Sequence, residues 1–286
     1  MTSTRVTVGI TASRAAQRAA EWAAREARLR NLPLRLVTAV DAPPSDDARY
    51  DDAADDHGKS VLAEARDAVS RTAPDVDSDT VLRRGPASRV LVEESREAFL
   101  LVIGARGLDG VSPTNSGSTT DVLAVHARCP VAAIREGEAE LPGSGPVLVG
   151  VDGSPVGERA LAFAFHEAAL RNAPLQALHA WSDAPAEPWV QRRGTGLSWD
   201  RIEDRERALL AERLAGRQEQ HPDVEVDRIV VQDRPVRHLV ERAHRAQLVV
   251  VGSRGRGGFA GMLLGSTSQA LLHSCPAPLV IVRHQP

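Results

Sequence analysis

Short runs of apolar, β-branched residues alternate along the whole chain with longer segments rich in alanine and charged residues. The short runs are typical of buried strands, and the longer segments are typical of helices that turn one face to a core. The pattern predicts strands at 5–10, 34–40, 76–82, 100–103, 131–134, 146–151, 175–181, 224–231, 248–251 and 279–282. It predicts helices at 14–30, 59–71, 156–171 and 200–218, with further helices starting near 87, 118, 236 and 266. Such regular alternation predicts an α/β fold with a parallel sheet covered by helices on both faces.

The pattern occurs twice. Gly-Ala-Arg-Gly, nine residues and Gly-Ser occupy 104–118, and Gly-Ser-Arg-Gly, nine residues and Gly-Ser occupy 252–266, which lies 148 positions later. Near the front of each half the offset is 141, as between Gly9 and Gly150, so the second half holds about seven extra residues. We place them in the loop around 182–200. Self-similarity of this kind predicts two copies of one domain.

The predicted domains, 1–136 and 146–286, are each large enough for their own core, and a Gly- and Pro-containing linker joins them. With 42% apolar and 26% charged residues, the composition is that of a soluble globular protein. A net charge of −3 provides no positive field to attract nucleic acid. No apolar run is long enough to cross a bilayer. We therefore expect a cytoplasmic protein that binds neither nucleic acid nor membrane.

Side chains that bind metals are scattered. Cys129 and Cys275 do not occupy equivalent positions of the repeat and form no Cys-x-x-Cys pair. The nine histidines include no His-Glu-x-x-His pattern. We therefore expect no metal site built from side chains. No serine, histidine and acid can be assigned to a catalytic arrangement either, so no catalytic residue is predicted.

The ends of the first and fourth strands are the natural place for a ligand, because ligands of such sheets bind where the winding direction switches. Glycine there lets the backbone approach a ligand, and a Gly-Ser at a helix start offers free N–H groups to an anion. In the second half, phosphate would meet these N–H groups, the hydroxyls of Ser266, Thr267 and Ser268, and Arg254 or Arg256.

Asp152 stands at the end of the first strand of the second half. Its carboxylate can accept hydrogen bonds from the sugar or base of a nucleotide, and the alternative is that it caps the next helix with Ser154. The expected ligand-binding residues of this half are Gly150, Val151, Asp152, Gly252, Ser253, Arg254, Gly255, Arg256, Gly257, Gly265, Ser266, Thr267 and Ser268.

The first half is predicted to be weakened as a site. Thr11 replaces the carboxylate, and Pro113 removes a backbone donor from the loop. Its corresponding residues are Gly9, Thr11, Gly104, Gly107, Gly117, Ser118 and Thr119. Lys59, the one lysine, stands in Gly-Lys-Ser, but Ala53 replaces the first glycine of a P-loop, so we interpret this match as accidental. The acidic segment 41–56 is expected to be a solvated loop.

With these motifs the chain resembles the universal stress protein family in its tandem form. The spacing Gly-x2-Gly-x9-Gly-Ser/Thr occurs in both halves, and the strand pattern Val-Gly-Val-Asp-Gly-Ser occurs only at 149–154. The resemblance implies a five-stranded parallel sheet of order 3-2-1-4-5 in each half, two doubly wound domains in tandem. It also implies that the halves pair through their last strands as an internal dimer, while a homodimer of chains stays open.

The resemblance further implies binding of ATP with Mg2+. Asp152 and the backbone near Ala180 would then hold the adenosine end, and Gly252, Gly255, Gly265, Ser266 and Thr267 would hold ribose and phosphates. Three functions remain open: an ATP-binding regulatory protein of stress responses with an unknown protein partner, a slow Mg2+-dependent ATPase or phosphotransferase, and a protein-interaction scaffold that needs no nucleotide. The first is favoured, because no general base or nucleophile can be named.

Overall fold

The computed structural model describes residues 4–41, 48–105, 119–136, 143–181, 199–255 and 263–283. The strands of the first half are β1 (Arg5–Gly9), β2 (Leu34–Val40), β3 (Ser78–Arg84), β4 (Ala98–Ala105) and β5 (Val131–Arg135). Those of the second half are β6 (Val147–Gly150), β7 (Leu175–Trp181), β8 (Val226–Gln232), β9 (Leu248–Gly252) and β10 (Leu279–Val282). The helices are α1 (Arg14–Arg30), α2 (Ala48–Thr72), α3 (Ala87–Glu94), α4 (Thr119–His126), α5 (Pro155–Arg171), α6 (Trp199–Gln220), α7 (Pro235–Ala243) and α8 (Ser266–Ser274).

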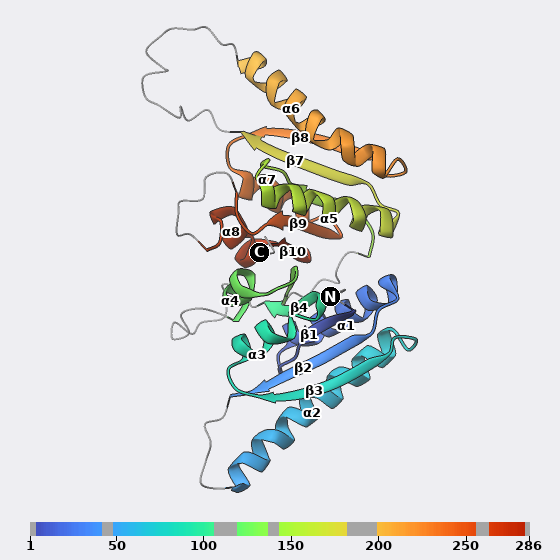
Figure 1. The fold of residues 1–286 in the computed structure, drawn as a ribbon, viewed down its shortest axis with the longest axis vertical. Helices are drawn as coiled ribbons and strands as arrows, with labels where there is room; N and C mark the ends of the chain where they lie inside the picture. The colour runs from blue at the N-terminus through green and yellow to red at the C-terminus, as the bar shows by residue number, and fades with distance from the viewer. Residues whose placement is uncertain are drawn as a thin grey trace.

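All the strands join one sheet of order β3-β2-β1-β4-β5-β10-β9-β6-β7-β8. Within each half the strands are parallel, in the predicted order 3-2-1-4-5. β5 and β10 pair antiparallel, with Val280 opposite Ala132, so the sheets of the two halves join edge to edge through their last strands (Figure 1). The edge strands are therefore β3 and β8.

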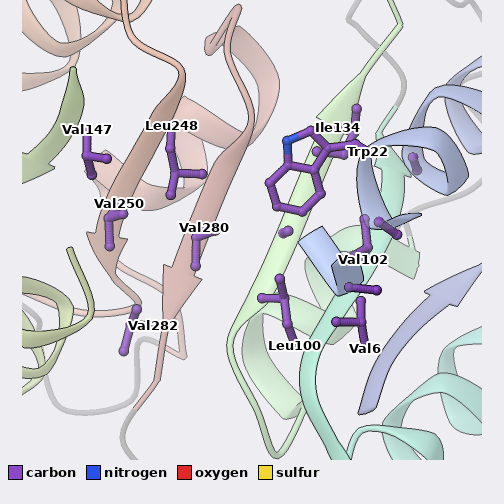
Figure 2. Close-up of a cluster of buried hydrophobic side chains, with 14 of the residues drawn as sticks. Val6, Trp22, Leu100, Val102, Ile134, Val147, Leu248, Val250, Val280 and Val282 are labelled. Atoms are coloured by element: carbon purple, nitrogen blue, oxygen red, sulfur yellow. The ribbon is translucent and has the colours of Figure 1, made fainter. Parts of the chain in front are cut away.

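Helices cover both faces of the sheet. On one face, α1, α2, α5 and α6 enclose a core that runs without a break through both halves. Figure 2 shows this core on either side of the β5–β10 pair, with Ile134 and Val280 on the two adjoining strands. On the other face, α3 and α4 cover one apolar cluster, and α7 and α8 cover a second. None of the helices in the described ranges has both the length and the apolar composition that a membrane-spanning helix needs.

Two boundaries of the predicted strands were wrong for the same reason. The strands predicted from 76 and 224 begin two residues later, as β3 and β8. Val76 N–H donates to Ala73 O and Val224 N–H donates to His221 O, at 3.2 Å each. The first residue of each apolar run therefore belongs to the turn that closes the preceding helix.

The acidic segment 41–56 was expected to be a loop, but α2 already includes its residues from 48 onward. Gly58 lies inside this helix, where glycine is normally unfavourable. A Cβ at Gly58 would lie 2.8 Å from Leu82 Cδ1 and 3.1 Å from Val40 Cγ2, so the helix packs directly on β2 and β3 at this point. Tertiary packing outweighs local propensity here.

Four buried charged side chains link α1 to α5. Arg171 lies 2.5 Å from carboxylate oxygens of both Glu26 and Glu167, and Arg30 pairs with the same two carboxylates. No side chain of the four is more than 7% exposed. Burial opposes the charge of Arg30, but attraction by Glu167 and Glu26 outweighs it and raises its pKa. We call this group the inter-half charge cluster.

Candidate functional site

A cavity of about 490 Å³ opens at the carboxyl ends of β6, β7 and β9, a volume typical of small-molecule sites. It lies where the winding of the second half switches direction between β6 and β9. Its lining residues are Gly150, Val151, Asp152, Leu178, His179, Ala180, Trp181, Glu206, Pro235, Leu239, Val251, Gly252, Arg254, Gly255, Gly265, Ser266, Thr267 and Ser268.

The start of α8 forms the polar end of the cavity. Gly265 is the N-cap residue, in extended conformation, and it provides no side-chain hydrogen bond to the first turn. The first intrahelical bond closes only at Gln269 N–H, which donates to Gly265 O at 2.9 Å. The N–H groups of the first turn come before Gln269 and therefore take no part in the i to i−4 hydrogen bonds of the helix. Ser266 and Thr267, which belong to this turn, line the cavity. The positive end of the helix therefore faces a space that an anion can enter.

Contacts within the protein fix the backbone conformation of the glycine loop after β9. A Cβ at Gly252 would lie 3.2 Å from Gly157 N, because the end of β9 rests on the start of α5. Gly265 N–H donates to Ser253 O at 2.8 Å, and Ser253 N–H donates to Val282 O at 2.8 Å. The first bond holds the loop against the start of α8, and the second holds it against the end of β10. The glycines of the motif therefore have two roles. They let the loop pack closely beside the start of α8, and they leave room for a ligand.

Asp152 is held between two glycines. A Cβ would lie 2.2 Å from its Oδ1 at Gly157 and 2.6 Å from its Oδ2 at Gly255, so larger residues would displace the carboxylate. Oδ1 accepts from Ser154 N–H at 3.0 Å and from Ser154 Oγ at 2.8 Å. Ser154 itself caps α5, accepting from Gly157 N–H at 3.0 Å. Asp152 thus orients the cap and also lines the cavity.

The opposite end of the cavity is largely apolar. Leu178 and Leu239 are buried on the face covered by α7, and Pro235 and Ala180 complete this wall. Trp181 is 9% exposed and also lines the cavity. A flat aromatic or heterocyclic group suits such a wall, and phosphate suits the α8 end.

His179 and Glu206 form a polar pair in the cavity wall. Nδ1 of His179 lies 2.7 Å from Val151 O, and Nε2 lies 2.9 Å from Glu206 Oε2. His179 is 5% exposed, and the Glu206 side chain is 23% exposed. The sequence reasoning missed both, because they are 27 residues apart and no motif links them.

Positive charge gathers near the α8 end. Arg254 lines the cavity, and its Nε donates to Leu263 O at 3.3 Å. Burial, and then repulsion from Arg128 and Arg254, lowers the pKa of Arg283 at the end of β10. Guanidinium groups that repel one another favour an anion beside them.

Not every expected residue reaches the cavity. Ser253 is buried and braces the loop. Ser268 does line the cavity, but its hydroxyl already donates to Gly252 O at 2.6 Å. Arg256 and Gly257 lie outside the described residues. The other second-half residues predicted from the sequence all line the cavity.

In the first half, the equivalent positions are packed more tightly. A Cβ at Gly9 would lie 2.9 Å from Leu91 Cδ1, whereas at Gly150 it would lie 3.6 Å from Leu239 Cδ1. At Gly104 it would lie 2.5 Å from the backbone of Ala15.

Thr11 replaces Asp152 in the contact with the helix cap, since its Oγ1 lies 3.0 Å from Ser13 Oγ. Thr119 begins α4 in the described range, and Gly107, Gly117 and Ser118 lie outside the described residues. Within that described part of the chain, no three His, Cys, Asp or Glu side chains are grouped as a metal site.

Comparisons with known proteins agree with this fold. The profile of the universal stress protein family matches residues 2–135 and 144–283. A universal stress protein of Mycobacterium tuberculosis is 42% identical over 296 residues, 97% of this chain and 96% of the relative. One from Mycolicibacterium smegmatis is 38% identical over 289 residues, with the same coverage of 97% and 96%. The crystal structure of a universal stress protein from Archaeoglobus fulgidus matches with a TM-score of 0.75 over 100% of both chains at 16% identity, which shows a shared fold.

Proposed function

Because the chain belongs to the universal stress protein family, we propose that its second half binds ATP in the cavity described above and that the protein acts as a nucleotide-dependent regulator in stress responses. The triphosphate would lie at the start of α8 and the adenosine against the apolar wall. Mg2+ would enter with the triphosphate, and we assign no side chain to it.

One observation supports this proposal above the others: α8 begins at a glycine without a side-chain cap and opens on a cavity beside an arginine-bearing glycine loop. The starts of α1 and α5 differ, because Ser13 and Ser154 accept hydrogen bonds from their first turns. Unpaired N–H groups at a helix start are a general phosphate site. The residues at this end fit a phosphate chain without any lysine.

A regulatory role suits the site better than turnover. His179 is the histidine of the cavity wall, and both its ring nitrogens are engaged, with Val151 O and with Glu206. It is therefore not poised to take a proton from water or a hydroxyl. A bound nucleotide can still act by favouring one of two states of the protein, provided that its affinity for the two differs.

The test is isothermal titration of the full chain with Mg·ATP, comparing wild type with Thr267→Glu. A carboxylate in the first turn of α8 is compatible with the helix dipole, so the fold is retained, but it would repel a phosphate at the same place. We expect the variant to bind at least about tenfold more weakly, since like charges at about 5 Å repel by a few kcal/mol at an effective dielectric of about 20.

Gln269→Glu is the matched control, because it makes the same charge change at an exposed position of the same helix and does not line the cavity. Its affinity should stay within about twofold of wild type. Equal affinity of Thr267→Glu and wild type would refute the placement of the phosphates, and no binding by wild type would refute the proposed function itself.

A further inference from the structure

At the positions of the first half that are equivalent to His179 and Glu206, the residue types are different. His179 corresponds to Thr38 at the offset of 141, and Glu206 corresponds to Gly58 at the offset of 148. The second offset holds for this helix, because α2 ends at Thr72 and α6 ends at Gln220.

The two pairs occupy equivalent places in three dimensions. Thr38 Oγ1 donates to Ile10 O at 2.9 Å, as His179 Nδ1 bonds to Val151 O at 2.7 Å. A Cβ at Gly58 would lie 3.4 Å from Thr38 Cγ2, so α2 contacts β2 where α6 contacts β7. In the first half this space is filled by packed backbone and methyl groups. In the second half the same space holds a hydrogen-bonded polar pair that lines the cavity (Figure 1 shows α6 along β7 and β8).

The hydrogen-bond partners fix what Glu206 offers to the cavity. A carbonyl oxygen only accepts, so Nδ1 of His179 carries the hydrogen that it donates to Val151 O. Nε2 and Glu206 Oε2, at 2.9 Å, therefore share one further hydrogen. Whether that hydrogen is bonded to Nε2 or to Oε2, the other oxygen, Oε1, is an acceptor. Among the described residues, Oε1 has no hydrogen-bond partner.

The position of Glu206 indicates which part of a nucleotide it meets. The glycine loop follows β9, while His179 lies on β7, and β6 separates the two strands. A carboxylate beside the phosphates would be repelled by them, whereas on the β7 side it can accept a hydrogen bond from a neutral donor.

We propose that Glu206 is a specificity-determining residue that accepts a hydrogen bond from a neutral N–H or O–H donor of the bound nucleoside, and that His179 is a positioning residue that holds its carboxylate in place. This inference rests on the proposed function and deepens it. A donor of this kind is either the exocyclic amino group of the base or a ribose hydroxyl. The first half lacks both residues, so it lacks this recognition.

The experiment titrates the full chain with ATP, ITP, 2′-deoxy-ATP and 3′-deoxy-ATP, all as Mg2+ complexes. ITP lacks the exocyclic amino group, and the deoxy nucleotides each lack one hydroxyl. Glu206→Ala should weaken ATP binding by about tenfold or more, because the donor of the bound nucleoside loses its acceptor and is left unpaired. It should have no effect on the one analogue that lacks the bonded donor, which identifies the donor. Glu206→Gln keeps a neutral acceptor and should lie between wild type and Glu206→Ala.

His179→Thr installs the residue of the first half, which can keep the bond to Val151 O but not the bond to Glu206. It should reduce discrimination among the nucleotides, and adding it to Glu206→Ala should cause no further loss. Asp204→Ala is the matched control, with the same charge change on α6 at a side chain that is 73% exposed.

Two outcomes would overturn the inference: Glu206→Ala binds ATP as tightly as wild type, or it loses the same factor with all four nucleotides. Both require that wild type binds ATP, so they are distinct from failure of the proposed function, in which wild type binds no ATP.

Discussion

The inter-half charge cluster provides a direct measure of how the two halves are held together. Glu167 is fully buried, and its carboxylate pairs with Arg30 and Arg171, whose side chains are 5% and 7% exposed. Glu167→Gln keeps the shape of the side chain and removes only its charge. Glu26 then faces two buried guanidinium groups alone, and breaking a buried pair in this way costs about 3 to 5 kcal/mol.

We expect Glu167→Gln to lower the free energy of unfolding by about 3 kcal/mol, at the lower end of that range because Glu26 still contacts both arginines. The assay is urea unfolding of the full chain, followed by far-UV circular dichroism. Because one sheet and one core run through both halves, we expect a single transition in wild type.

The matched control is Glu241→Gln, which removes the charge from an exposed i,i+4 pair with Arg237 and should leave the free energy of unfolding almost unchanged, because solvent screens the pair. A decrease in the free energy of unfolding of less than about 1 kcal/mol for Glu167→Gln would refute the reasoning, since removing one partner of a buried ion pair is strongly destabilising. Replacing all four members of the cluster by methionine should be close to neutral, because no charge is then left unpaired.

Three further predictions follow from local geometry. Gly104→Ala should lower the melting temperature by several degrees more than Gly265→Ala, because a Cβ would lie 2.5 Å from the backbone of Ala15 in the first case and 3.4 Å from its nearest neighbour in the second. Thermal unfolding that ranks the two variants the other way would contradict this packing. Ser154→Ala should cost about 1 kcal/mol in urea unfolding through loss of the α5 cap; an unchanged midpoint would show that the cap is dispensable. Burial raises the pKa of both cysteines, Cys129 and Cys275, to about 12. At pH 8 the two thiols should therefore react with a disulfide reagent only after the protein is denatured. The free energy of unfolding should fall as pH rises from about 9 towards 12, because the thiols ionise in the unfolded chain before they ionise in the native protein. Rapid labelling of two thiols in the native protein would contradict their burial.

The sequence predicts most of the fold because its signals are local. The bounds of α1 are recovered in full, since Ser13 accepts from the first turn and Asn31, in the left-handed region, ends the helix. The start of α2 was not predicted, because glycine is normally unfavourable inside a helix, and the packing of Gly58 close to Leu82 joins segments that are distant in the sequence.

The site divides in the same way. The glycine loop and the start of α8 form one contiguous motif, so they were found from spacing. The apolar wall and the pair His179–Glu206 come from elements that only the folded sheet brings together. One signal was present in the sequence: Thr38 and Gly58 are replaced by a histidine and a glutamate in the half that keeps the glycine loop and the aspartate.

The most direct test of nucleotide binding is a crystal structure of the full chain grown with Mg·ATP. We predict density for a triphosphate against the first turn of α8, at Ser266 and Thr267, with the base against Leu178 and Leu239. A well-ordered structure in which that cavity holds only solvent, or in which ATP occupies another surface, would contradict the account.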